Sequence, residues 1–160
     1  MRSVLLKTLL LLFFHQVIFA SKNDYIFPFS DPSFSNYGSV GLMQLPTARL
    51  HPGGTIAFNW IDNEPYQRGS IVAYPFDWFE ASYQYTDINN ALYSNVPQFS
   101  GDQTYKDKSF DAKIRLLKER MLLPQISVGG RDLGGTGVFS SEYIVLSKRV
   151  GNFDLTGGIG

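Results

Sequence analysis

The chain has 160 residues, of which 44% are hydrophobic, 15% aromatic and 18% charged, so it can form one domain with its own core and is not a disordered segment. Basic and acidic residues number 14 each, and this balance gives no overall field that favours nucleic acid. The absence of cysteine excludes a disulfide framework, a thiol nucleophile, a thiolate metal site and a lipid-bearing cysteine.

Residues 1–20 have the pattern of a secretory signal peptide, with basic residues before an apolar run and a small side chain, Ala20, before the predicted cleavage site. The alternative is a retained membrane anchor, but the apolar run 9–14 is too short to cross about 30 Å of hydrocarbon. The sequence therefore predicts an exported protein. Residues 21–37, rich in proline, phenylalanine and serine, are expected to form an irregular periplasmic leader.

The remainder, residues 38–160, reads as an all-β domain of extended segments separated by Gly, Pro and Asn turn signals. The pattern predicts an antiparallel up-and-down meander. The expected strands lie near residues 38–44, 54–61, 68–74, 79–86, 108–118, 124–131, 138–149 and 153–160.

One of these strands shows two distinct faces. Its apolar and charged side chains alternate in the order Phe110, Asp111, Ala112, Lys113, Ile114, Arg115. This alternation is typical of a barrel strand between lipid and a wet lumen, because an unpaired charge facing lipid costs several kcal/mol. The rival interpretation of 110–121 is a helix with an apolar stripe at Phe110, Ile114, Leu117 and Met121. The neighbouring strands favour the extended form.

The lengths of the connections favour an outer-membrane barrel. If the N-terminus lies in the periplasm, the periplasmic connections are 45–53, 75–78, 119–123 and 150–152. The outer connections are then 62–67, 87–107 and 132–137. The longest and most polar of them, 87–107, falls outside the cell, and short inner turns with longer outer loops are usual in such barrels.

Candidate catalytic groups are few. Asp77 and Glu80 flank Trp78 in the manner of a glycosidase pair, but a turn aspartate and a lumen-facing glutamate explain both residues without catalysis. His51 is the only histidine outside the predicted signal, and its place beside Pro52 and Gly53 favours a solvated turn. We therefore expect no enzyme activity, no metal site and no cofactor.

Polar residues in the strands and one loop are the candidate contacts for a polymer. Arg131 and Asp132 lie in a glycine cluster, 129–137, that lacks the spacing of a phosphate-binding loop. Lys113 and Arg115 lie on the charged face of their strand. We predict that these four side chains line a lumen or a loop site.

Aromatic residues near the expected strand ends are the candidate membrane-interface girdle. They are Trp60, Trp78, Phe76 and Tyr143. Aromatic rings are enriched at both interfaces of membrane barrels. A carbohydrate-stacking surface or a packed core remains the alternative for the same residues.

Four stretches carry a resemblance to a known family. They are residues 35–49 (SNYGSVGLMQLPTAR), 74–80 (YPFDWFE), 108–116 (KSFDAKIRL) and 128–143 (VGGRDLGGTGVFSSEY). Together they resemble the YjbH (GfcD-like) family of outer-membrane proteins associated with exopolysaccharide or group 4 capsule production. The resemblance implies a large outer-membrane barrel that helps to export or assemble polysaccharide, without an assigned catalytic residue.

The family resemblance also implies the partners. They would be outer-membrane lipid, an exopolysaccharide or capsular polysaccharide, and other polysaccharide-export proteins, with no nucleic acid. Family members are several times longer, so the chain is expected to be an N-terminal portion that forms an open, incomplete sheet. The alternative function is a soluble secreted β-sandwich that binds glycans through its aromatic residues.

Overall fold

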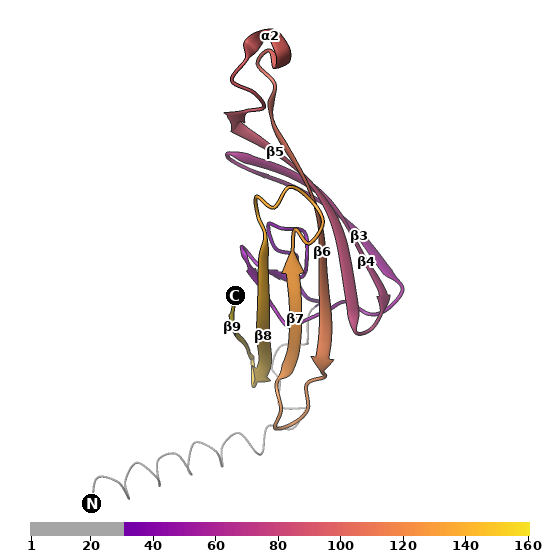
Figure 1. Cartoon of the computed structure of the whole chain (residues 1–160). Coiled ribbons are helices and arrows are strands. Elements are labelled where there is room, and N and C mark those ends of the chain that lie inside the picture. The colour runs from indigo at the N-terminus through magenta and orange to yellow at the C-terminus, as the bar shows by residue number, and fades with distance from the viewer. Residues whose placement is uncertain (1–30) are drawn as a thin grey trace, which may run out of the picture.

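The computed structural model describes residues 31–160, so the predicted signal peptide and most of the predicted leader lie outside the described residues. Seven strands form one antiparallel sheet in chain order, and the sheet curls into an open half-barrel (Figure 1). The strands are β3 (Thr55–Asn63), β4 (Tyr66–Phe76), β5 (Phe79–Leu92), β6 (Thr104–Leu117), β7 (Gln125–Arg131), β8 (Ser141–Val150) and β9 (Phe153–Ile159). The predicted all-β meander is confirmed. A second large sheet, which a β-sandwich requires, is absent from residues 31–160.

The connections alternate between the two ends of the sheet. One end carries the connections 77–78, 118–124 and 151–152. The other end carries 64–65, 93–103 and 132–140. The segment 93–103 contains the short helix α2 (Pro97–Ser100), toward which β5 and β6 project (Figure 1). The sequence predicts this division of the connections between the two ends. The predicted connection 45–53 joins no strands of the sheet, and the predicted loop 87–107 shortens to 93–103 because β5 continues to Leu92 and β6 begins at Thr104.

The region 104–117 is a strand and not the rival helix. β6 is hydrogen-bonded to β5 along one edge and to β7 along the other. Its side chains alternate between buried and more exposed positions. Hydrogen bonds to both neighbouring strands satisfy the backbone groups of β6. The local sequence fits the two-residue period of a strand and the 3.6-residue period of a helix almost equally, so this pairing decides for the strand.

The first predicted strand, 38–44, does not join the sheet, and this expectation is wrong. Only β1 (Gly41–Leu42) and β2 (Leu45–Pro46) form there, as a hairpin that is separate from the seven-stranded sheet. We call residues 33–51 the interior segment, because they lie against the inner, concave side of the sheet. This segment appears in indigo behind β7 and β8 in Figure 1.

The outer face of the sheet is apolar. Register places Phe58, Ile71, Tyr83 and Phe110 in one row across β3 to β6. A second row crosses β5 to β9 and contains Phe79, Ile114, Val128, Ile144 and Ile159. Most of these large side chains are exposed, including Ile71 at 53%. Cross-strand rows of this kind form a continuous exposed apolar surface, which is unusual for a protein that meets only water.

The inner face of the sheet is polar. In the part of the chain that the structure describes, nineteen polar or charged residues are buried, against seven hydrophobic ones. The hydrophobic cluster is small and joins Val40 and Leu50 of the interior segment to Val72 and Tyr74 of β4. Residues 31–160 contain no helix with the length and apolar character needed to cross a bilayer. The polar inner face and the interior segment therefore position the candidate site.

Candidate functional site

The interior segment is held at Val40 by a buried ion pair of the sheet. Glu80 of β5 and Lys113 of β6 are 2% and 1% exposed at their side chains, and their charged groups are 3.0 Å apart. Lys113 Nζ donates to Val40 O at 3.0 Å, and Val40 N donates to Glu80 Oε2 at 3.2 Å. Tyr74 Oη also donates to Glu80 Oε2, at 2.7 Å. The pair therefore satisfies both backbone groups of Val40, as a neighbouring strand would.

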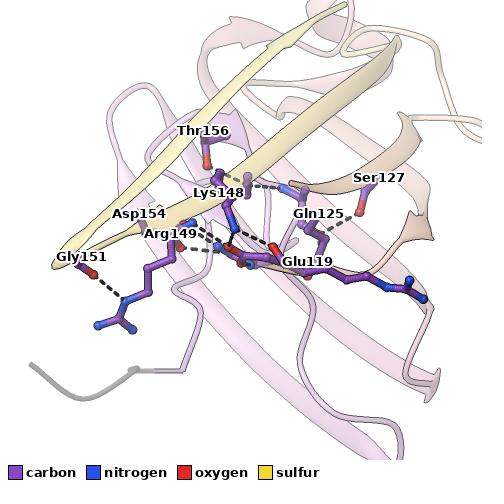
Figure 2. A network of polar contacts seen from close by, with 12 residues as sticks. Glu119, Gln125, Ser127, Lys148, Arg149, Gly151, Asp154 and Thr156 are labelled. Carbon is purple, nitrogen blue, oxygen red and sulfur yellow. Dashed lines mark hydrogen bonds and ion pairs between the residues drawn. The ribbon is translucent and has the colours of Figure 1, made fainter. Parts of the chain in front are cut away.

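A second anchor holds the interior segment at Ala48. Ala48 N donates to Ser147 Oγ at 2.9 Å. Ala48 O accepts from Ser127 Oγ at 2.8 Å and also from Gln125 Nε2. Figure 2 shows Gln125 and Ser127 beside the charged cluster described next. Two residues of the segment, Val40 and Ala48, are thus fixed through their backbones by inward side chains of β5 to β8.

A charged cluster fixes the end of the interior segment. Arg49 donates to both oxygens of Asp154, with Nη2 to Oδ1 at 2.6 Å and Nε to Oδ2 at 3.1 Å. Its Nη1 lies 2.5 Å from Glu119 Oε2. The other oxygen of Glu119 accepts from Lys148 Nζ at 3.0 Å and from Arg149 N at 2.9 Å (Figure 2). The two parallel hydrogen bonds between Arg49 and Asp154 fix the orientation of the guanidinium group, in addition to the attraction between the charges.

The electrostatics of the cluster favour its ionised form. Burial alone would raise the pKa of Glu119, but hydrogen bonds from Arg149 N, Arg49 and Lys148 outweigh burial and lower this pKa. Burial likewise opposes the charge of Arg49, and its bonds to Asp154 and Glu119 outweigh that effect and raise the pKa of Arg49. Glu119 is therefore an anion that three donors share at neutral pH.

Acid is expected to weaken this anchor. A carboxyl group whose folded pKa is lowered contributes stability above its unfolded pKa, about 4.3 for glutamate, and loses that contribution as the pH falls through the folded value. Glu119→Gln should lower the free energy of unfolding by about 1–3 kcal/mol at pH 7. The difference from wild type should shrink below about pH 4. Urea unfolding of both proteins between pH 3 and 7 measures this.

The control for that experiment is Glu64→Gln, which changes an exposed carboxylate at the opposite end of the sheet. It should leave the free energy of unfolding within about 0.5 kcal/mol of wild type. A Glu119→Gln deficit of the same size at pH 3 and pH 7 would contradict a role for the charge.

Three of the four candidate polymer contacts are buried on the inner face. They are Lys113, Arg131 and Asp132. Arg115 follows Lys113 on the same face of β6 and is half-buried, and its backbone N donates to Trp78 O at 2.8 Å. Lys113 holds the interior segment, whereas Arg131 meets it through Gln44 O at 3.2 Å. Lys113 and Arg131 therefore contact the interior segment, whereas Asp132 is hydrogen-bonded to Asp111 and to the backbone of Phe139.

Two important inward residues were not singled out from the sequence. Arg68 of β4 and Arg49 of the interior segment are both buried. Glu80, which the sequence predicts to face the lumen, is buried on the inner face beside Lys113. For Arg68 a signal was present, because Arg68 and Ser70 alternate with Gly69 and Ile71. Arg49 carries no such signal, since its carboxylate partners lie 70 and 105 residues away.

The aromatic candidates divide between the two faces. Trp60, Phe76 and Trp78 are exposed, with Trp60 packed on Gly69 of the neighbouring strand and the Phe76 and Trp78 rings stacked 5.4 Å apart.

Tyr143 instead lies on the inner face, so its prediction as a girdle residue is wrong. Its ring covers Gly129, where an added Cβ would meet the Tyr143 hydroxyl at 2.5 Å. A glycine in the facing strand thus makes room for an aromatic ring that turns inward.

The carboxylates considered for hydrolysis do not form an open pair. Glu80 faces the interior and is occupied by Lys113, Tyr74 and Val40. Asp77 lies in the β4–β5 turn, and its Oδ1 accepts from Gly53 N at 2.7 Å. His51 stacks on the Phe34 ring and meets the Tyr74 ring edge-on, so it is packed and is not the solvated turn residue that was expected. Within residues 31–160 no group of three or more His, Cys, Asp or Glu is arranged to hold a metal ion.

Comparison with known proteins gives the chain a family. The family described as exopolysaccharide biosynthesis protein YbjH matches residues 33–160, which are the interior segment and the whole sheet. The chain belongs to this family. The Escherichia coli (strain K12) protein named uncharacterized lipoprotein YjbH is 51% identical over 129 residues, which cover 81% of this chain and 18% of that relative. The chain thus spans less than a fifth of the length of the YjbH relative.

The name lipoprotein belongs to that relative. The present sequence contains no cysteine that could carry a thioether-linked lipid. The comparison with solved structures found no match.

Proposed function

We propose that the chain forms the N-terminal part of an outer-membrane β-barrel that serves exopolysaccharide export or assembly, without catalysis of its own. The observation that carries this proposal is the reversed polarity of the sheet. Charged and polar side chains fill the concave side, while rows of large apolar side chains cover the convex side. A barrel between lipid and a wet lumen requires this distribution, and a water-soluble sheet requires the opposite one.

The outward aromatics support a membrane position. Trp60 is paired with Gly69, and Phe76 stacks with Trp78 near the opposite end of β4. The seven residue steps from Gly69 to Phe76 span roughly 23 Å along the strand. At the usual strand tilt of about 35–45° this is roughly 16–19 Å across the membrane, which is most of the apolar band of a membrane barrel, about 25 Å. The aromatic groups would then lie near the two interfaces.

The edges of the sheet support a larger barrel. Among residues 31–160, β3 is paired only with β4, and β9 only with β8. An open edge is not stable in hydrocarbon because its backbone groups lack partners. We therefore propose that further strands of a longer polypeptide, like the YjbH relative, close the barrel. Its partners would be outer-membrane lipid, the polysaccharide and other export proteins.

Cell fractionation with epitope insertion tests this function. The protein should sediment with outer membranes and need detergent for extraction. An epitope placed after Gly101, beside α2, should bind antibody on intact cells, whereas one placed after Arg120 should bind only after permeabilisation. Loss of the gene should reduce the polysaccharide at the cell surface. Recovery of the processed chain from the periplasm without detergent would refute the proposal.

A further inference from the structure

Two buried arginines form a stacked column with aromatic rings on the inner face. Arg68 of β4 lies with its Cζ 4.3 Å from the centre of the Tyr66 ring and 4.9 Å from that of Tyr37. Arg131 of β7 lies 4.1 Å from the same Tyr37 ring and 5.8 Å from that of Tyr143. Tyr37 belongs to the interior segment, so a ring from outside the sheet contacts two guanidinium groups from different strands.

Neither guanidinium has a full set of partners. Arg68 is 3% exposed and Arg131 is 9% exposed, and the Nε atom of each is buried without a hydrogen-bond partner. Among the ion pairs of residues 31–160 neither arginine takes part. Arg131 makes one hydrogen bond, from Nη2 to Gln44 O at 3.2 Å. Buried donors without partners are costly and call for a specific explanation.

Three acidic residues nearby make hydrogen bonds within or to the 132–140 loop. Asp107 accepts from the Thr136 hydroxyl. Asp111 accepts from Asp132 N at 2.8 Å, and Asp132 accepts from Phe139 N at 3.3 Å. The second oxygen of Asp107 and that of Asp132 are buried without a hydrogen-bond partner, like the Nε atoms of the two arginines. Among residues 31–160 neither arginine forms an ion pair with these carboxylates.

The geometry points to a binding site for the carboxylate of an acidic sugar residue, formed by Arg68 and Arg131 and covered by Tyr37. A guanidinium presents a planar fork of donors that matches a carboxylate. Tyr66, Tyr143 and Phe139 border the two forks and offer faces on which a sugar ring can stack. This inference rests on the proposed function, because it names the chemistry of the polymer that the interior would meet.

Tyr37 can be removed without releasing the interior segment. Hydrogen bonds between side chains of the sheet and the backbone of Val40 and Ala48 hold that segment in place, and none of them involves the Tyr37 ring. Tyr37→Ala should therefore uncover Arg68 and Arg131 while the segment stays in place. This variant therefore tests the effect of the Tyr37 ring while the backbone anchors of the segment are kept.

Titration calorimetry on the full chain in detergent tests the site, with tetragalacturonate as the acidic probe and maltotetraose as the neutral one. Tetragalacturonate should bind and maltotetraose should not. Tyr37→Ala should bind the acidic probe more tightly than wild type. Arg68→Gln and Arg131→Gln should each weaken binding to the Tyr37→Ala protein by about tenfold or more, as the loss of a charge-assisted hydrogen bond predicts. Arg120→Gln changes an exposed arginine in the 118–124 connection. It is the control and should leave binding unchanged.

Folding is checked by circular dichroism. If a glutamine variant fails to fold, Arg68→Lys or Arg131→Lys keeps the charge, loses the planar fork and should still weaken binding. Equal binding of both oligosaccharides, unchanged binding in every arginine variant, or equally tight binding of inorganic phosphate would overturn the assignment. Absence of binding by a protein that fractionates with outer membranes removes this inference alone. Binding by a protein found in the periplasm removes the proposed function alone.

Discussion

Replacing Lys113 with methionine is expected to lower the free energy of unfolding by about 3–5 kcal/mol, because it leaves Glu80 charged, buried and without its cation. The substitution also removes the donor to Val40 O. The double variant Glu80→Gln with Lys113→Met should recover at least half of the loss. It contains no buried charge at this point, and the glutamine oxygen can still accept from Tyr74 Oη and Val40 N. Urea unfolding of the three proteins measures the effect.

Arg115→Met is the matched control for that comparison. It removes a cation from the same strand and the same face, two residues away, where no ion pair is found among residues 31–160. Its effect should stay within about 0.5 kcal/mol. A double variant as unstable as Lys113→Met would show that packing or the Val40 contact, and not the uncompensated charge, accounts for the loss.

If the outer face of the sheet meets lipid, as we propose, Ile71→Arg should destabilise the protein by about 2–4 kcal/mol, as a cation near the bilayer midplane does on the lipid face of a barrel. Ile71 is exposed and lies in the row that also contains Phe58, Tyr83 and Phe110. The amount of protein in the outer membrane and its unfolding in lipid vesicles report the loss.

The same substitution distinguishes lipid from water. On a surface that meets water, an exposed isoleucine replaced by arginine would be neutral or would improve solubility. Asn63→Arg serves as the control because it places the same cation at the last residue of β3, beside a turn. It should cost no more than about 1 kcal/mol. Equal tolerance of both variants would contradict a lipid-facing surface at Ile71.

Taken together, the contacts describe a half-barrel whose interior is already occupied. The backbone of the interior segment is held at Val40 and Ala48, and its end is held by Arg49. A polymer that uses this interior must share the space with residues 33–51 or displace them. The Tyr37 ring between Arg68 and Arg131 is the point at which we propose that such an exchange begins.

The positions of most strands could be read from the sequence because the relevant pattern is local. In β6, Asp111 and Lys113 face inward while Phe110 and Ile114 face outward. The inward residues are two apart and the outward ones four apart, in keeping with the two-residue period of a strand. Turn residues such as those at 77–78 and 151–152 mark the ends. The sequence by itself therefore determined the meander, the alternating faces and the inward direction of Lys113.

Only the tertiary structure decided what fills the concave side. Residues 38–44 have the composition of a strand, yet the partners of Val40 are side chains 40 and 73 residues away. The sequence predicts an outward ring for Tyr143. In the structure the ring lies on the inner face, because Gly129 of the neighbouring strand has no side chain and leaves space for it. The ion pairs of Arg49 and the column around Tyr37 likewise join distant segments. Side-chain periodicity encodes which face a residue takes, but the partner across the interior depends on how far the sheet curls, and no local pattern carries that information.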